Sequence, residues 1–395
     1  MPSICLNFHV HQPRWLKHYT FFDIDHDHVY EDVERNLQIL NKVSDKCYLP
    51  ANSIMLDLLN QYQGDFRIAF SISGICLDQF EKHRVDVLDS FKRLADTGCV
   101  EFINETYHHS LAFLFSAREF KEQVMLHKKK IKTLFGQNPK TFRNTGLIYN
   151  NDLARTIEKM GFDVILAEGA DKILGWRSPH YVYQPAGCKK LKLLLRNYRL
   201  SDDIAFHFSD SKWSEHPLMA DKYAHWIHNL NDTGDRDSIN LDMDYETFGN
   251  HPWEKAGFFE FIQMLSREIV KHPDYRFQTP SEIAGDYDPI DQLDVTDFIS
   301  SADGEQDLST WVGNNLQKDA INTLYSMESN VRRRKDGMFL HTWRMLQASD
   351  HFFYMCTKRP ADEDVQKHSN PYGSPYDAYI NYMNIIDDFS GYFGN

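Results

Sequence analysis

The chain has 395 residues, of which 42% are hydrophobic, 14% aromatic and 25% charged, and its formal net charge is −14 at pH 7. These proportions are typical of a soluble globular protein, and the acidic balance excludes nucleic acid and anionic membranes as partners because both repel negative charge. The six cysteines form no C-x-x-C pair, and no segment has the roughly 18 consecutive apolar residues of a membrane span, which excludes a zinc ribbon and a transmembrane helix.

The N-terminal stretch MPSICLNFHVHQP has neither a basic region nor a long apolar run, so we expect no signal peptide and a cytoplasmic location. Within it, residues 4–10 alternate between apolar and polar and predict a strand. Six further strands are predicted, at 66–73, 99–105, 141–145, 163–168, 192–197 and 238–244.

Amphipathic segments separate these strands. One ends at Gly98, and another is opened by an S-x-x-E capping box at Ser116 and Glu119 and runs to about Gly136. A further helix is predicted after Pro252. Alternating strands and helices indicate a parallel sheet, and polar residues at the ends of several strands favour a closed barrel over an open sheet.

The strand pattern stops near residue 290, which predicts a barrel domain at 1–290 and a helical domain at 291–395. In the second part, helices are expected at 309–331, 337–356 and 375–392, with a polar loop between the last two.

Two histidines, His9 and His11, come at the end of the first strand. Because side chains alternate along a strand, both face the same side, which is the barrel axis if Phe8 and Val10 face the helices. This pattern suits either hydrogen-bonded interior histidines or a site, and imidazoles are common metal ligands.

The third strand carries Glu101 and ends near Glu105, with His108 and His109 in the loop that follows. A carboxylate inside a strand is costly unless it is paired. Glu101 is therefore expected to have a buried partner or a function.

The fourth and seventh strands also end in polar residues. The sequence TFRNTG places Arg143 at a strand end and Gly146 shortly after it, and SINLDMDYETFG brings Asp242 and Asp244 to one face of a strand, followed by Glu246. Carboxylates at such a position favour function over structure. In the helical part, Asp350 is expected on the same helix face as Trp343 and Leu346.

These stretches, in this order, resemble glycoside hydrolase family 57, and in particular its α-amylase-like branch. The resemblance rests on His11-Gln12-Pro13, the G-x-x-E segment Gly98 to Glu101, the FRNT-x-LIYNN stretch from 142 to 151, the segment from Asp244 to Gly249, and Ser349-Asp350-His351. It implies an incomplete (β/α)7 barrel followed by a C-terminal helical bundle, and retaining hydrolysis of α-1,4-glucans such as glycogen, starch and maltodextrin without a metal or other cofactor.

The resemblance also implies roles for individual residues. Asp244 is expected to be the general acid/base, and His11, Glu101, Glu246 and Asp350 are expected to bind sugar. From their placement, His9, Trp15, His109 and Arg143 are added as sugar-binding residues.

The position at which the family carries its nucleophilic glutamate is occupied by Gly146. Glycine has no side chain, so the covalent intermediate of a retaining mechanism cannot form there. One reading is a protein that binds α-glucan and has lost hydrolysis. In a second reading, Glu101, Glu168 or a held water takes over catalysis. In a third, His9, His11, His109 and Asp244 bind a divalent metal, as in sugar deacetylases or α-mannosidases on related barrels.

Overall fold

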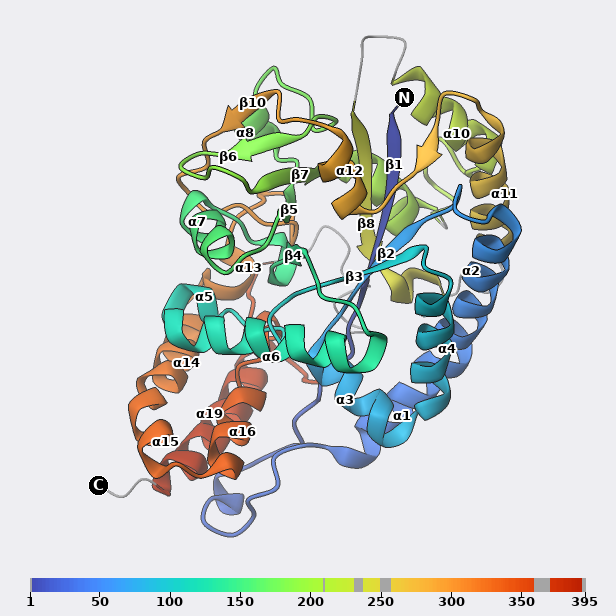
Figure 1. Ribbon diagram of the computed structural model, residues 1–395. Coiled ribbons are helices and arrows are strands. Elements are labelled where there is room, and N and C mark those ends of the chain that lie inside the picture. Colours follow the sequence, from blue (N-terminus) through green and yellow to red (C-terminus); the bar gives the residue numbers. More distant parts are fainter. Residues whose placement is uncertain (1, 209, 231–236, 249–256, 359–369, 393–395) are drawn as a thin grey trace.

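The computed structural model describes residues 2–208, 210–230, 237–248, 257–358 and 370–392. Its centre is a ring of parallel strands that follows the seven predicted ones (Figure 1). Their bounds are β1 Ser3–Val10, β2 Ile68–Ile72, β3 Val100–Ile103, β4 Thr141–Arg143, β5 Val164–Glu168, β7 Lys192–Arg196 and β8 Ser238–Asp244. Around the ring the order is β1, β2, β3, β4, β5, β7 and β8, and β8 pairs with β1 again.

Two seams in this ring are thin. The strands β3 and β4 meet only through the bridge between Asn104 and Phe142, and β7 meets β8 at Arg196 and Asn240. The predicted fold class, an incomplete barrel with a helical C-terminal part, is confirmed. Three short strands were not predicted from the sequence: β6 Tyr183–Pro185, β9 Arg276–Phe277 and β10 Asp291–Leu293.

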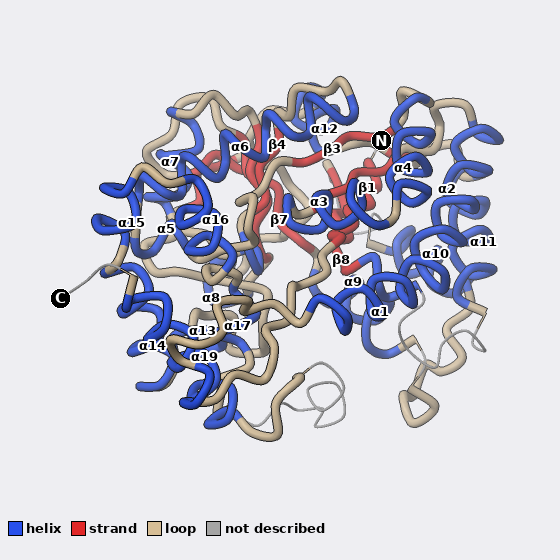
Figure 2. Tube along the Cα trace, turned by 90° about the horizontal axis from the view of Figure 1, so that it is seen from below, coloured by secondary structure: helices blue, strands red, loops and turns tan. Residues whose placement is uncertain are grey.

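Helices surround the strands, as Figure 2 shows. Their bounds are α1 Val33–Val43, α2 Leu49–Tyr62, α3 Gly74–His83, α4 Val85–Asp96, α5 Ala112–Phe115, α6 Ala117–Phe135, α7 Asn151–Lys159, α8 Asp171–Leu174, α9 Tyr198–Asp202, α10 Ala220–Asn229, α11 Phe258–Lys271 and α12 Pro280–Asp286. The predicted limits of α6 are confirmed, because the Ser116 side chain caps its first turn and Gly136 ends it in a left-handed conformation. Pro252 lies outside the described residues.

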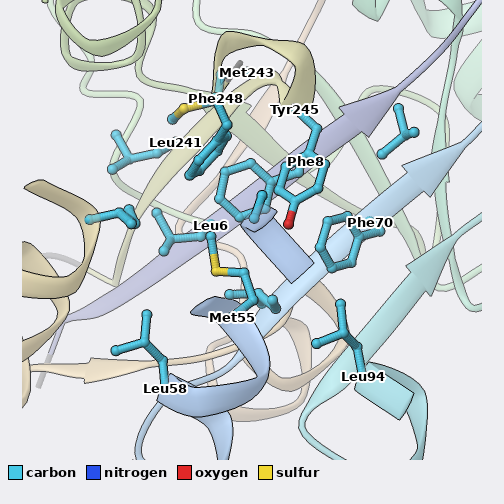
Figure 3. Packing of buried hydrophobic residues seen from close by; sticks show 14 of the residues in the cluster. Leu6, Phe8, Met55, Leu58, Phe70, Leu94, Leu241, Met243, Tyr245 and Phe248 are labelled. Atoms are coloured by element: carbon cyan, nitrogen blue, oxygen red, sulfur yellow. The ribbon is translucent and has the colours of Figure 1, made fainter. Parts of the chain in front are cut away.

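Alternation along the strands sends one set of side chains to the helices and the other into the barrel. Phe8 and Phe70 face outward and pack with Tyr245 and Phe248 under α2 and α4 (Figure 3). A small apolar cluster fills the barrel interior, and it includes Cys5, Ala69, Ile103, Val164, Leu166 and Leu194. Closer to the carboxyl ends of the strands, the side chains that point into the barrel are polar.

The helical part begins with α13 Ser309–Val312 and continues with α14 Asn315–Ser326, α15 Glu328–Arg334, α16 Gly337–Met345, α17 Ser349–Phe353 and α19 Pro375–Gly391. Two of the long helices predicted here are therefore broken. Asn314 caps α14 and so starts a new helix. The chain leaves the helix after α16 because Ala348 forms a bridge with Ser110 of the barrel. Asp350 consequently lies on α17, not on one helix with Trp343.

The division at residue 290 stays a prediction. Strand β10 follows it directly and pairs with β6. The core around β4, β5 and β7 also continues into the helical part, with Trp343 and Phe352 fully buried in it. Among the described helices, none is both long and apolar enough to cross a membrane.

A buried ion-pair network joins α6 to the helical part. Glu119 of α6 has no exposed surface and accepts hydrogen bonds from Arg332 at 2.5 Å and from Arg344 at 2.7 Å. Glu122, one turn further, accepts from the same two arginines at 2.9 and 2.7 Å, but 36% of its side chain is exposed.

We predict that Glu119→Gln lowers the free energy of unfolding by about 3–5 kcal/mol, because it leaves two partly buried guanidinium groups without their fully buried partner. The matched variant Glu122→Gln is expected to cost about 1 kcal/mol or less, since an exposed pair contributes little. Urea unfolding midpoints of the two variants measure the difference. Equal shifts would contradict this account of how the two parts are joined.

Candidate active site

The polar groups gather at the carboxyl ends of β1, β3, β4 and β8, which we call the barrel mouth. His9, near the end of β1, is 5% exposed, and its register partner on β8 is Asp244. The His9 Nδ1 atom donates to Asp244 Oδ1 over 3.2 Å. The Asp244 side chain is 69% exposed, so its carboxylate faces the opening of the mouth.

On its other side, His9 faces Glu105. The His9 Nε2 atom lies 3.7 Å from Glu105 Oε2, and the same oxygen lies 3.2 Å from His109 Nδ1. Glu105 is fully buried, and its second oxygen accepts from Ser71 Oγ at 2.9 Å. His109 has a positive φ of 51°, a conformation that costs a non-glycine residue energy. The loop is held there by the bond from Ser349 N to His109 O.

His11 connects the barrel to the helical part. Its Nε2 atom donates to Asp350 Oδ2 at 3.0 Å, and its Nδ1 atom accepts from Ser73 Oγ at 2.8 Å. Both ring nitrogens are thereby satisfied. The backbone N–H of His11 donates to Glu246 Oε1 at 3.1 Å, and the Tyr48 hydroxyl donates to the same oxygen. The rings of His9, His11 and His109 lie together, with centroids 4.1 to 5.8 Å apart.

The charges of this cluster shift several pKa values. The protein around Asp244 raises its pKa even though the side chain is largely open to solvent, but the hydrogen bond and charge of His9 outweigh this effect and bring that pKa to about 2. Burial and the charge of Arg143 lower the pKa of His9, but its hydrogen bond to Asp244 and the nearby Glu105 carboxylate raise it to about 9. Burial and the nearby Asp244 charge raise the pKa of Glu246. Asp244 is therefore ionised when the mouth is empty.

Arg143 lies deeper in the barrel. Its Nη2 atom donates to Asp242 Oδ1 at 3.3 Å, whereas its Nε and Nη1 atoms are buried without a partner. Other buried atoms without a partner belong to Asn7, His9, Asn144, Asn240 and Asp242. Buried polar groups are normally hydrogen-bonded. The space among Asn7, Asn240 and Asp242 admits no water-sized sphere, so these unsatisfied atoms do not by themselves mark a ligand pocket.

Glu101 lies apart from these side chains, and the sugar-binding role expected from the G-x-x-E segment stays a prediction. Its carboxylate accepts from Ser281 N at 2.9 Å and from the hydroxyls of Ser281 and Thr141. The register pairs Glu101 with Ala69, at the level of Asn7, while Glu105 lies four residues further along the chain. Glu101 lines a separate pocket with Gly98 and Lys140, at the amino ends of β3 and β4.

Gly146 lies just past the end of β4, in a short 3-10 segment, Thr145–Leu147, with φ of +56°. A Cβ atom at this position would lie 2.2 Å from the Cη2 atom of Trp311, which belongs to α13. The Gly146 carbonyl also accepts from Ser301 N at 2.9 Å. The helical part thus fills the space into which a side chain at this position would extend.

The remaining predicted residues lie at the edge of the site or beside it. The Arg35 guanidinium lies 4.2 Å from the centre of the Trp15 ring, and the Trp15 backbone N–H donates to Asn36 Oδ1 at 2.8 Å. Glu168 is buried at the end of β5 and pairs with Arg196 at 3.1 Å. Burial raises the pKa of Glu168 to about 7 against the opposing charge of Arg196.

Sequence reasoning missed three contributors. Glu105 follows Glu101 by four residues and lies closer to the carboxyl end of the strand. Since Glu101 lies near the start of the strand, the sequence could have indicated that Glu105, and not Glu101, reaches the barrel mouth. Tyr48 comes from a π-helical turn, Ser44–Tyr48, and Trp311 comes from the helical part. No local pattern connects those two residues to the mouth.

Comparisons with known proteins agree with this architecture. The family profile described as Glycosyl hydrolase family 57 matches residues 5–296. A protein of Methanocaldococcus jannaschii, provisionally named an α-amylase, is 42% identical over 98% of this chain and 84% of its own length. An α-amylase of Pyrococcus abyssi is 22% identical, and the match covers 58% of this chain but only 34% of the relative.

A solved structure of similar fold is the branching enzyme of Pyrococcus horikoshii, with a TM-score of 0.69 and 14% identity. The match covers 93% of this chain and 87% of the enzyme. At this identity the likeness concerns the fold alone.

We predict that Gly146→Ala destabilises the protein by clearly more than the ~1–2 kcal/mol that a positive φ costs an alanine, because the methyl group overlaps Trp311. The matched variant Gly136→Ala, also at positive φ but with nothing within 4 Å of the added Cβ, should show the conformational cost alone. In a Trp311→Ala background the cost of Gly146→Ala should fall to that of Gly136→Ala. Thermal unfolding midpoints of the set test this, and an unchanged cost in the double variant would contradict it.

Proposed function

The chain belongs to glycosyl hydrolase family 57, and from this premise we propose that it binds α-1,4-glucan at the barrel mouth and does not cleave it by the retaining route. The observation that carries the proposal is Gly146. By resemblance its position is that of the nucleophile, and the contact with Trp311 leaves no room for a carboxylate there.

The rest of the mouth supports a sugar ligand. The carboxylates of Asp244, Glu246 and Asp350 suit the many hydroxyls of a glucan, because charged acceptors form the stronger hydrogen bonds. His11, whose ring nitrogens are both engaged, holds Asp350 in place. Trp15 offers an aromatic ring, with the Arg35 guanidinium 4.2 Å from its centre.

Asp244 is the proposed counterpart of the acid/base. Its pKa near 2 suits a carboxylate that accepts hydrogen bonds better than an acid that donates a proton at neutral pH. This agrees with binding in preference to catalysis while position 146 lacks a carboxylate, because a second carboxylate close by would raise the pKa of Asp244.

Hydrolysis through a substitute carboxylate has less support. Glu101 is fully engaged with Ser281 and Thr141 at the other end of the strands, and Glu168 is held by Arg196 and by the Gly169 backbone N–H. A general base or nucleophile must reach the sugar or an attacking water, and neither group is free to do so.

We predict that calorimetry detects binding of maltoheptaose by the unmodified protein, and that Asp350→Asn weakens it roughly 10- to 100-fold through loss of hydrogen bonds to a charged group. His11→Asn should weaken binding as well, because it removes the bond that positions Asp350. The control Glu101→Gln should bind normally, because its side chain lies outside the mouth. Normal binding by both mouth variants, or no binding by the unmodified protein, would contradict the proposal.

We further predict that reducing-sugar assays on maltooligosaccharides detect no hydrolysis by the unmodified protein or by Gly146→Glu, whose new side chain collides with Trp311. The double variant Gly146→Glu/Trp311→Ala should gain hydrolysis, since the carboxylate then has room. Adding Asp244→Asn should abolish that gain by removing the second carboxyl group that the retaining route requires. Hydrolysis by the unmodified protein that Asp244→Asn abolishes would show that the family reaction persists without the nucleophile, against our proposal.

A further inference from the structure

We propose that His9, Glu105 and His109 form a binding site for one divalent transition-metal ion of the Zn²⁺ type. These residues are all buried, and each offers a ligand atom within 4.8 Å of the other two. The inference goes beyond glucan binding and does not depend on it, because the three ligands are side chains of the chain itself.

Both distances from Glu105 Oε2 suit shared coordination, although the one to His109 Nδ1 is also that of a hydrogen bond and only the one to His9 Nε2 is too long for it. Two ligand atoms bound tetrahedrally to one zinc ion at about 2.0–2.2 Å lie roughly 3.3–3.5 Å apart. Glu105 Oε2 lies 3.2 Å from His109 Nδ1 and 3.7 Å from His9 Nε2, which brackets this value. The longer separation exceeds that of a hydrogen bond, and His9 Nε2 is a buried atom without a hydrogen-bond partner.

The groups around the three residues orient them as ligands. Asp244 accepts from His9 Nδ1, which directs Nε2 toward Glu105, and carboxylate–histidine pairs of this kind commonly support metal ligands. Ser71 donates to Glu105 Oε1, which leaves Oε2 for the ion. Two histidines and one carboxylate leave a fourth position for water or a sugar hydroxyl, as at zinc sites that act on substrates.

Neighbouring groups mark the limits of the site. His11 has both ring nitrogens engaged, with Ser73 and Asp350, and therefore does not qualify as a ligand. A second acidic group in the described residues, formed by Asp303, Glu305 and Asp307, is more exposed, and the Lys358 ammonium already pairs with Asp303 and Glu305. That group supplies a control for non-specific binding to carboxylates.

The test uses the full chain, purified without an affinity tag and treated with a chelator. Calorimetric titration with Zn²⁺ is expected to show one site, and Co²⁺ is expected to give the visible absorption of a four-coordinate ion. His109→Gln and Glu105→Gln should each weaken Zn²⁺ binding at least 100-fold, and Asp244→Asn should weaken it about 10- to 100-fold as a supporting residue. Asp244 is exposed, so its variant tests the site even if a buried substitution prevents folding.

Two control variants should bind Zn²⁺ as the unmodified protein does: Glu305→Gln in the other acidic group, and His108→Gln, a buried histidine beside His109. The proposal would be overturned if Zn²⁺ titration showed no single site. It would also be overturned if Glu305→Gln lost Zn²⁺ binding while the Asp244 and Glu105 variants kept it. Maltoheptaose binding measured in the presence of chelator is read separately, so failure of the glucan proposal would not be mistaken for failure of the metal site.

Discussion

Charged side chains cannot be buried without partners, and this constraint organises the barrel mouth. The parallel strands place His9, Glu105, Arg143 and Asp242 inside the barrel, where each needs a counter-charge or hydrogen bond. The helical part supplies one partner that the barrel lacks, Asp350, which accepts from His11. That bond requires the chain to leave the helical path between α16 and α17, and the bridge between Ser110 and Ala348 fixes the departure. The irregular backbone of the helical part is thus a consequence of the polar mouth.

The packing of the helical part against the barrel also determines which side chain fits at position 146. Trp311 occupies the space next to Gly146, and Ser301 binds the Gly146 carbonyl. A barrel that carried a glutamate here would need a different residue, or a different path, in α13. Gly146 and Trp311 therefore form one structural unit. A carboxylate at this position would therefore need a change of packing between two parts of the chain and not a single substitution alone.

Local patterns predicted the barrel well because its strands are short, apolar on one face and regularly spaced. Each of the seven predicted parallel strands has a counterpart, and His9, His11, Asp244 and Asp350 do converge. Alternation alone could not rank Glu101 against Glu105, because both side chains point inward and the register shows which one reaches the mouth. The breaks in the C-terminal helices depend on contacts with the barrel loop at Ser110, which no helix periodicity records. For the same reason Trp311 could not be connected with Gly146.

The balance of charge at the barrel mouth affects which ligands can bind there. Glu105, Asp242, Asp244, Glu246 and Asp350 bring five carboxylates, whereas the cations near them include Arg143, Arg196 and the protonated His9. In the metal-free protein the proton on His9 offsets part of the excess, and it does so between Asp244 and Glu105. A divalent ion bound to His9, Glu105 and His109 would replace that proton and bring one more positive charge to the same place. A neutral glucan cannot compensate charge in this way, although its hydroxyls can donate to the carboxylates. The two proposed ligands therefore act on different parts of the barrel mouth. The ion compensates the negative charge of its buried carboxylates, and the sugar forms hydrogen bonds with its exposed carboxylates.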